Sequence, residues 1–356
     1  MSRKPIRVLI DSDPLVYRVG FAVQETWYKL HWCDVDPESP DDAFSDKDYW
    51  ARFRYKWRLE EFARLRGLHP EEVTVTPYVI HEPLSHALHV MKEQLENILK
   101  AVKGALADYP EFAKRPIRPE LYLSGSTNFR DKVATIRGYK ANRDRDRRPV
   151  WYKEIRDYLV EQWDAVIVEG YEADDAVAME QFKAGDEYDV NTIIATINKD
   201  LKMVPGWHYN TLTAEDYLIT REQALRFFYL QLLTGDATDN IPGLYRIGEK
   251  KAATMLPDTT NEKELYKAVL DAYAENLETF GDNKQARERN FGRHEEPIGL
   301  LWENARLLWM LEHEDQLWTP PGMKDESIKG AGLLVQGDEF LAPKTGEAGR
   351  EDPDEF

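Results

Sequence analysis

Short continuous apolar runs alternate with longer stretches of helical spacing over the first half of the chain. The short runs have the length and β-branched content of buried strands and cover residues 7–10, 121–123, 165–168 and 192–197. The helical stretches cover 83–106 and 151–163, and a further helix opens at Glu172. This alternation predicts an α/β fold with a mainly parallel central sheet flanked by helices.

From residue 220 onward the apolar spacing becomes purely helical. The first of these helices places Leu225, Phe228, Tyr229, Leu232 and Leu233 on one face, and further helices are expected near 262–280 and 297–314. The last forty residues change to Gly, Pro and acidic residues. We therefore expect a core at 1–219, a helical region at 220–318 and a mobile acidic tail at 319–356.

Residues 24 to about 80 interrupt the α/β pattern. This stretch carries Trp27, Trp32, Trp50 and Trp57 among dense charges, and 49–66 has helical spacing. It is interpreted as a helical and aromatic insertion that packs over the core.

Composition bounds the class of protein. The chain has 356 residues with 42% hydrophobic and 12% aromatic content, enough to bury the core of one large or two modest domains. No apolar run is long enough to span a bilayer, and no signal peptide is expected, so neither secretion nor membrane insertion is predicted. Cys33 is the single cysteine, which fits a reducing, cytoplasmic location.

A basic segment lies inside this acidic chain. The formal net charge is −18, yet residues 130–148 hold eight basic and three acidic residues, a local balance of +5. The segment is either a solvated charged loop or a site for nucleic-acid phosphates. Its basic residues are Arg130, Lys132, Arg137, Lys140, Arg143, Arg145, Arg147 and Arg148.

Seven carboxylates form four short clusters, and three of these clusters immediately follow strand-like apolar runs or a helical run. Parallel strands end at one edge of a sheet, so these acids are expected to converge. Closely packed carboxylates repel one another, and divalent cations such as Mg²⁺ or Mn²⁺ neutralise them. The sequence therefore predicts metal-dependent phosphoryl chemistry. The seven acids are Asp11, Glu172, Asp174, Asp175, Asp200, Asp236 and Asp239.

The turn at 170–176 places three of these acids at the start of a helix. Helix N-termini favour negative side chains, so a purely structural role is one interpretation. The other is a metal site, in which Glu172 and Asp175 lie on one helix face and Asp174 on another, dividing the carboxylates between two cations.

A glycine-bounded turn follows Asp239. Gly243 and Gly248 allow exposed backbone N–H groups next to a helix start, which together favour phosphate binding. Lys250 and Lys251 add positive charge. The stretch is predicted to hold a nucleic-acid backbone without reading its sequence.

These motifs resemble those of the structure-specific 5′-nucleases, the flap endonuclease family. The likeness rests on Glu172-Ala173-Asp174-Asp175, Lys199-Asp200-Leu201 and 235–253, and it spans residue 6 to about 256. Phe129-Arg130 followed by 138–143 is similar to the basic helical arch of the family. The family includes the 5′→3′ exonuclease domain of bacterial DNA polymerases and stand-alone phage replication exonucleases, and the phage branch is the closest likeness.

The resemblance implies a PIN-like core with a basic arch at about 126–150 and a helix-3-turn-helix at 236–256. It implies hydrolysis of DNA at free 5′ ends, flaps or nicks to give 5′-phosphates, in phage replication or recombination alongside phage replication proteins. It also implies two divalent cations, and K⁺ held by backbone carbonyls in the turn. A monomer is expected.

The resemblance further assigns roles to residues. Asp11, Glu172 and Asp174 would hold one metal, and Asp175, Asp200, Asp236 and Asp239 the second, with Asn198 able to offer a carbonyl oxygen. Lys140 and Arg143 would act on the scissile phosphate, and Tyr139 or Tyr17 either stacks a terminal base or is ordinary core. The predicted DNA-binding residues are Arg130, Lys132, Arg137, Tyr139, Lys140, Arg143, Gly243, Gly248, Lys250 and Lys251.

Two positions depart from the family pattern. No aspartate follows the second strand at 123–126, and Asn198 stands where the family has aspartate. Asp13 could compensate at the first position. A DNA-binding relative without catalysis and a PIN-type ribonuclease therefore stay as alternatives. The histidines at 81, 86 and 89 could suggest zinc, but they lack a fourth ligand, and solvated or packed histidines are expected.

Overall fold

The structure of the chain is a computed structural model. The structure describes residues 4–31, 49–51, 57–65, 67–143, 148–185, 191–280, 283–292, 294, 296–314 and 316–323. Trp32, Cys33 and nearly all of the predicted acidic tail lie outside these ranges. The chain divides into two compact units. The first comprises Met1–Asp13, Asn97–Asp146 and Val160–Phe356, and the second comprises Pro14–Glu96 and Arg147–Leu159.

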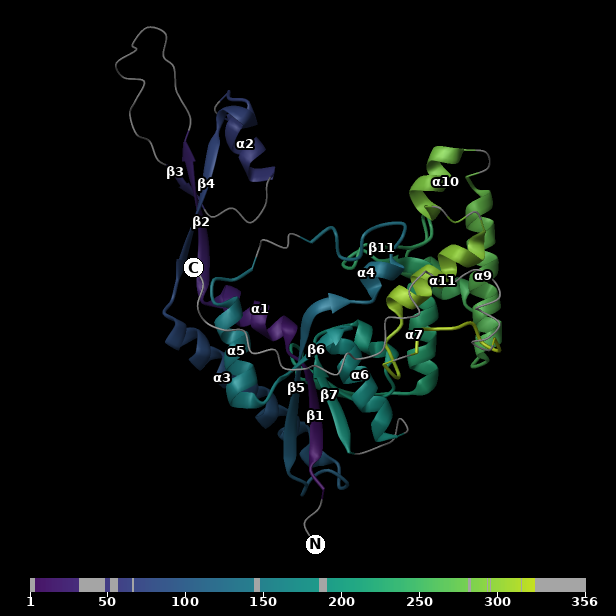
Figure 1. The fold of residues 1–356 in the computed structure, drawn as a ribbon, viewed down its shortest axis with the longest axis horizontal. Coiled ribbons are helices and arrows are strands. Elements are labelled where there is room, and N and C mark those ends of the chain that lie inside the picture. The colour runs from purple at the N-terminus through teal and green to yellow at the C-terminus, as the bar shows by residue number, and fades with distance from the viewer. Residues whose placement is uncertain are drawn as a thin grey trace, which may run out of the picture. The chain divides into compact units, whose positions relative to one another are not determined.

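A six-stranded sheet forms the centre of the first unit. Its order is β6-β5-β1-β7-β8-β9, and every neighbouring pair is parallel except β8 and β9. Figure 1 labels β1, β5, β6 and β7 of this sheet. The strands are β1 (Ile6–Asp11), β5 (Ile117–Asn128), β6 (Val166–Gly170), β7 (Thr192–Thr196), β8 (Gly206–Asn210) and β9 (Glu215–Ile219). The predicted α/β class with a mainly parallel sheet is confirmed.

The register of the central strands brings their carboxyl ends together. Ile10 of β1 pairs with Leu121 of β5 and with Ala195 of β7. All five positions of β7 are buried, as expected for a β-branched run inside a parallel sheet. Helix α6 (Ala173–Ala184) packs across β1, β5, β6 and β7, with Glu172 as its N-cap. The turns after β1, β5, β6 and β7 therefore share one edge of the sheet.

Helices form the rest of the described part of the first unit. They are α4 (Arg130–Val133), α7 (Arg221–Thr234), α8 (Glu249–Met255), α9 (Glu262–Glu278), α10 (Lys284–Phe291) and α11 (Pro297–Leu308), with short 3-10 helices η2 (Leu106–Asp108) and η3 (Asp200–Met203). A two-stranded hairpin of β10 (Gly235–Asp236) and β11 (Ile241–Pro242) follows α7.

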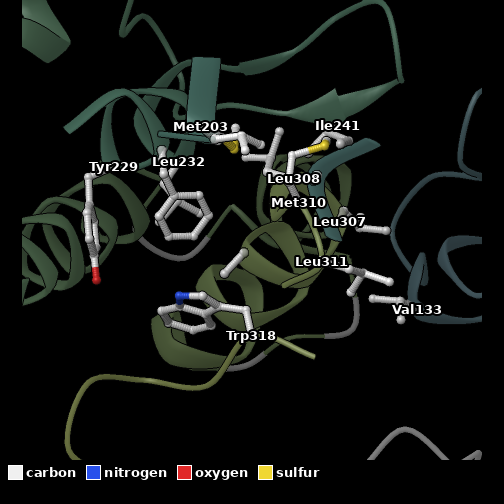
Figure 2. Packing of buried hydrophobic residues seen from close by; sticks show 14 of the residues in the cluster. Val133, Met203, Tyr229, Leu232, Ile241, Leu307, Leu308, Met310, Leu311 and Trp318 are labelled. Carbon is white, nitrogen blue, oxygen red and sulfur yellow. The ribbon is translucent and has the colours of Figure 1, made fainter. Parts of the chain in front are cut away.

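The mutual packing of α7, α9 and α11 buries a large apolar cluster. Figure 2 shows Tyr229, Leu232, Met203, Ile241 and Trp318 in this cluster. The helix predicted at 297–314 ends earlier, at Leu308, because Trp309 adopts extended backbone angles.

The second unit contains an antiparallel sheet that the sequence did not predict. Its order is β3-β2-β4, and β2 pairs with both neighbours. Only 57–65 of the predicted 49–66 helix is helical, since 49–51 pairs with β2 as a strand. The elements of this region are α1 (Asp13–Ala22), β2 (Gln24–His31), β3 (Tyr49–Ala51), α2 (Trp57–Leu65), η1 (Pro70–Glu72), β4 (Thr74–His81), α3 (Leu84–Ala105) and α5 (Tyr152–Trp163).

Helices α1, α3 and α5 have residues in both units. Across the described ranges, none of the helices combines the length and the apolarity that crossing a bilayer requires.

Candidate nuclease site

All seven predicted acids belong to the first unit, and polar side chains join most of them. The hydroxyl of Tyr139 lies 2.6 Å from Glu172 Oε2 and 2.9 Å from Asp239 Oδ2. These two acids come from the start of α6 and from the β10–β11 turn. Two clusters 67 positions apart in sequence (239 − 172) therefore meet around one phenol group.

A chain of hydrogen bonds ties the end of β1 to the start of α6. The backbone N–H of Asp13 donates to Asp11 Oδ1 (3.3 Å), and Asp13 Oδ2 accepts the backbone N–H of Ser124 (2.9 Å). The hydroxyl of Ser124 in turn accepts the backbone N–H of Ala173 (2.9 Å). Ser124 lies in the 123–126 stretch, where this chain lacks the aspartate of the family that it resembles. Its hydrogen bond to Asp13 brings a carboxylate to that stretch.

Two carboxylates of this edge are pushed toward their protonated forms. Burial, with Asp13 and Glu172 as further negative neighbours, raises the pKa of Asp11 to about 8. Burial and the charges of Glu172, Asp175 and Asp11 raise the pKa of Asp174 well above its usual value. Both carboxyls therefore favour the protonated form at this edge of the sheet.

Lys140 connects the acids of the two clusters. Its ammonium forms an ion pair with Glu172 and lies 3.7 Å from Asp239 Oδ2. Burial works against ionisation of Glu172, but the charges of Lys140 and Arg130 outweigh it and lower the Glu172 pKa. Lys140 has a φ of 52°, in the left-handed region that costs a side-chain-bearing residue energy. This strained residue lies where the basic segment meets the acids.

Backbone contacts hold that part of the basic segment on the β10–β11 turn. The N–H of Lys140 donates to the carbonyl of Asp239 (3.0 Å), and Arg143 pairs with the Asp239 carboxylate at 2.5 Å. The side-chain amide of Asn142 donates to the Ala237 carbonyl (2.8 Å), and that of Asn240 to the Gly138 carbonyl (2.9 Å). Lys140 and Arg143, the positively charged residues predicted to act on the scissile phosphate, therefore lie beside predicted metal ligands.

Asn198 lies between two acids, as a donor to one and an acceptor from the other. Its amide donates to Asp174 Oδ2 (2.9 Å), and its carbonyl oxygen accepts the N–H of Asp200 (3.0 Å). Asn198 therefore bridges the two acids, and its carbonyl oxygen keeps a second lone pair.

Asp200 and Asp236 share a lysine. Lys199 Nζ lies 2.8 Å from Asp236 Oδ2 and 3.9 Å from Asp200 Oδ1. Burial raises the pKa of Asp200, whereas burial of Asp236 is outweighed by its hydrogen bond from Lys199, and the Asp236 pKa falls. Gln231 of α7 also donates to Asp200 (2.7 Å).

Arg130 and Asp175 do not fit the roles predicted for them. The Arg130 side chain is 1% exposed, and Nη2 donates to Asp175 Oδ1 at 2.8 Å. Asp175 also accepts the N–H groups of Glu172 (3.1 Å) and Leu311 (3.2 Å). A buried guanidinium cannot contact DNA, and a carboxylate with these partners has little capacity left for a metal. The capping box at this helix start includes Asp175, and its contacts favour the capping interpretation.

Tyr139 also differs from its predicted DNA-binding role. It is 5% exposed and belongs to the apolar cluster, so the core interpretation holds and no base can stack on its ring in this structure. Lys132 and Arg137, on the same segment, are exposed, as a phosphate contact requires.

Gly243 and Gly248, the two glycines predicted to bind phosphate, have different surroundings in the turn at 243–248. A Cβ on Gly243 would lie 2.0 Å from the Thr234 carbonyl oxygen, so that glycine is needed for close backbone packing. Gly248 is exposed with no such obstruction, and Lys250 and Lys251 are exposed beside it. Asn276 of α9 fixes the turn by accepting the N–H of Tyr245 (3.1 Å) and donating to its carbonyl (3.2 Å).

His81, His86 and His89 of the second unit are exposed. His89 lies 3.4 Å from Glu93, and the ring of His81 packs edge-on against Trp151 at 4.9 Å. These contacts fit the solvated or packed role that the sequence predicts.

The acids fit divalent cations by chemistry rather than by a preformed cage. Within the described ranges, no group of three or more His, Cys, Asp or Glu side chains is gathered closely enough to hold a metal. Lys140, Lys199 and Arg143 instead pair with the carboxylates. Burial and neighbouring acids raise the pKa values of Asp11 and Asp174, and a bound hard cation with oxygen ligands would favour their ionised forms.

Sequence reasoning missed two polar residues that shape this region. Asn276 and Glu303 lie singly within the apolar pattern of α9 and α11, and their partners are distant in sequence. Lys199 lies inside a recognised motif but had no assigned role. Buried polar residues inside an apolar helix pattern are the signal that could have indicated the first two.

The chain is similar in sequence to bacterial DNA polymerases I. It is 33% identical over 184 residues to the thermostable DNA polymerase I of Thermus aquaticus, which is 48% of this chain and 20% of that protein. It is 32% identical over 125 residues to DNA polymerase I of Deinococcus radiodurans, which is 33% of this chain and 13% of that protein. The chain thus matches about a fifth or less of the length of these relatives. No family model matches the sequence.

Among solved structures, the T5 D15 protein co-crystallised with metal ions aligns with a TM-score of 0.40 and 18% identity, over 62% of this chain and 80% of that chain. The T5 5′-exonuclease with bound zinc aligns with a TM-score of 0.39 and 19% identity, over 60% and 80%. The sequence relationship is the stronger of the two. The chain is therefore related to bacterial DNA polymerase I, which confirms the predicted resemblance to the family that includes the 5′→3′ exonuclease domain of these polymerases.

Proposed function

We propose that this chain is a metal-dependent 5′→3′ exonuclease and flap endonuclease that hydrolyses DNA from 5′ ends and leaves 5′-phosphates. The observation that carries the proposal is the contact of Tyr139 and Lys140 with both Glu172 and Asp239, which joins the basic segment to two acidic clusters. The relationship to DNA polymerase I supports it. The proposed setting is phage DNA replication or recombination in the host cytoplasm, where the chain would act as a monomer.

The acids would hold two divalent cations, Mg²⁺ or Mn²⁺. One set is Asp11, Glu172 and Asp174, and the other is Asp200, Asp236 and Asp239 with Asn198 beside them. Asp175 is left out because Arg130 already occupies its carboxylate. Such cations, when bound, lower the pKa of a coordinated water and stabilise the leaving oxygen of a phosphodiester.

The basic residues supply the remaining electrostatics. Lys140 and Arg143 now pair with Glu172 and Asp239, the acids that cations would neutralise. Once their carboxylate partners are neutralised, both side chains become available to the phosphoryl oxygens of the scissile phosphate. Contacts of this kind favour the transition state because charge grows on those oxygens.

The helix-3-turn-helix would hold the duplex away from the cut. Gly248, Lys250 and Lys251 are exposed there, and Asn276 keeps the turn in shape. Backbone carbonyls of the same turn are the proposed site for K⁺. Lys132 and Arg137 would contact the phosphates that lead to the acids.

The test is incubation of 5′-labelled flap and nicked duplexes with Mg²⁺, Mn²⁺ or a chelator. Metal-dependent release of short products with 5′-phosphates is expected. Binding to these duplexes with no product under any metal would favour the non-catalytic DNA-binding alternative, for which the neutral Asn198 beside Asp174 is the specific observation. A preference for single-stranded RNA over DNA would favour the ribonuclease alternative.

A further inference from the structure

Glu303 is a buried acid of α11 that belongs to none of the recognised motifs. Its side chain is 5% exposed, and both oxygens contact residues outside its own helix. We propose that Glu303 is a positioning residue that anchors the basic segment at Thr135 and Ile136, so that Tyr139 and Lys140 reach Glu172. This inference rests on the proposed function for its catalytic meaning, but its structural part can be tested separately.

The contacts of Glu303 are directed at one short stretch of backbone. Oε1 accepts the N–H groups of Thr135 (2.8 Å) and Ile136 (3.0 Å). Oε2 accepts the hydroxyl of Thr135 and lies 2.7 Å from His294 Nε2. Burial opposes ionisation, but the hydrogen bonds from His294 and Thr135 outweigh it and lower the pKa of Glu303. An ionised carboxylate therefore holds a segment that has no helix or strand of its own.

The anchored stretch lies close in sequence to the site. Ile136 precedes Tyr139 by three positions and Lys140 by four, so its placement limits where their side chains can go. Gly292 packs closely against it, because a Cβ on Gly292 would lie 2.8 Å from Ile136 Cγ1. The chain around Ile136 is thus held both by Glu303 and by the segment after α10.

The C-terminal end of α11 also holds Arg130, the first residue of α4. Arg130 Nε donates to the carbonyl of Leu307 (2.8 Å), and Nη2 donates to that of Trp309 (2.8 Å). The C-terminal end of α11 therefore binds the basic segment at Arg130, and Glu303 binds it further along the chain. Burying an ionised carboxylate is costly, and an apolar residue of similar size would often give equal stability. Orientation of the segment is the role that accounts for the charge.

Four variants separate positioning from general stability. Glu303→Ala removes every contact, whereas Glu303→Gln keeps an oxygen that can accept both backbone N–H groups. Trp302→Phe is the matched control on α11, because it loses one side-chain hydrogen bond to Tyr266 (3.2 Å), which lies on α9 and not on the basic segment. Should Glu303→Ala fail to fold, Thr135→Val removes one donor to the same carboxylate.

The structural readout is amide hydrogen exchange of residues 134–143 without DNA or metal. Glu303→Ala is expected to exchange there at least tenfold faster than the parent chain, Thr135→Val by a smaller factor, and Glu303→Gln and Trp302→Phe close to the parent. Unchanged exchange in both Glu303→Ala and Thr135→Val, or equal acceleration in Trp302→Phe, would overturn the proposal.

The kinetic readout applies if the parent chain cleaves DNA. Glu303→Ala is expected to lower kcat at least tenfold with KM changed less than threefold, and Glu303→Gln to recover most of the rate. A loss confined to KM would contradict a role in positioning Lys140. Absence of cleavage by the parent chain would defeat the proposed function but leave the exchange result to decide the anchor.

Discussion

Asn198 donates its side-chain amide to the carboxylate of Asp174 across 2.9 Å. The carbonyl of the same amide accepts the N–H of Asp200. A neutral residue therefore relieves the crowding of two acids at the position where the family that this chain resembles has aspartate. The donated hydrogen bond stabilises the buried carboxylate of Asp174, whose pKa burial and neighbouring acids raise.

Asn198→Asp should lower the stability of the metal-free chain and raise its affinity for Mg²⁺. Without metal, the variant is expected to lose about 1–3 kcal/mol of unfolding free energy, because Asp174 loses its donor and gains a negative neighbour. With Mg²⁺, the melting temperature should rise more than that of the parent chain, and cleavage should increase about 10²-fold if the added ligand strengthens transition-state electrostatics. Thermal melts with chelator and with Mg²⁺, beside cleavage rates, check both parts. A variant as active as its parent would mean that the remaining ligands suffice.

Arg130→Met should unfold the chain more easily and leave its affinity for DNA unchanged. Asp175 would keep its burial and lose its guanidinium partner, which costs about 3–5 kcal/mol when one member of a buried pair is removed. Urea unfolding measures the loss. The salt dependence of DNA binding by the folded variant should match the parent, because Arg130 does not reach the surface. A shallower salt dependence would restore the DNA-contact role predicted from the sequence.

The sheet could be predicted because buried parallel strands are continuously apolar. The runs at 7–10 and 192–197 correspond to β1 and β7 for that reason. The antiparallel sheet of the second unit escaped prediction because 24–81 is dense in charges and has no clear alternation. β8, with the sequence Gly-Trp-His-Tyr-Asn, has no strand-like run either.

The acids of the site could be predicted from motifs, but the pairing of the charges could not. A count of basic residues cannot show that Arg130 is buried against Asp175, 45 positions away. Glu303 is a stronger example, because its partner Thr135 lies 168 positions away. Which charges are exposed depends on long-range packing, and local composition carries no information about it.

Lys140→Ala and Lys140→Gly should cleave DNA equally slowly but differ in their free energies of unfolding. Both lose the ammonium near Glu172 and Asp239, which should cost about 3 kcal/mol of transition-state stabilisation, or about 10²-fold in kcat. Glycine adopts the 52° φ of this position freely, so Lys140→Gly should exceed Lys140→Ala by about 1 kcal/mol in unfolding free energy. Cleavage rates and urea unfolding measure the two effects. Equal stabilities would show that the left-handed backbone does not persist in solution.

Lys250→Met should weaken DNA binding by an amount that depends on salt. Each phosphate contact contributes about 0.9 to the slope of log affinity against log salt concentration, so the slope should fall by about that amount. Lys267→Met is the matched control, because Lys267 is an exposed lysine of α9 that pairs with Asp271 at 2.6 Å. Fluorescence anisotropy with a nicked duplex at several salt concentrations measures both. Equal slopes for Lys250→Met and the parent would remove the turn from the duplex contact.

Without metal, the chain should lose stability as pH rises from about 4 to about 8. Asp11 has a folded pKa of about 8 against 3.8 when unfolded, so between those values the folded state holds a proton that the unfolded state has released. The unfolding free energy therefore falls with pH across this window, and Asp174 acts in the same direction. Asp11→Asn should flatten the slope measured by urea unfolding in chelator, because an amide does not titrate. Saturating Mg²⁺ should flatten it too, since a cation favours the ionised carboxylate. If the parent and Asp11→Asn show the same slope in chelator, the negative charge at this sheet edge is not concentrated on Asp11, and the case for a cation there weakens.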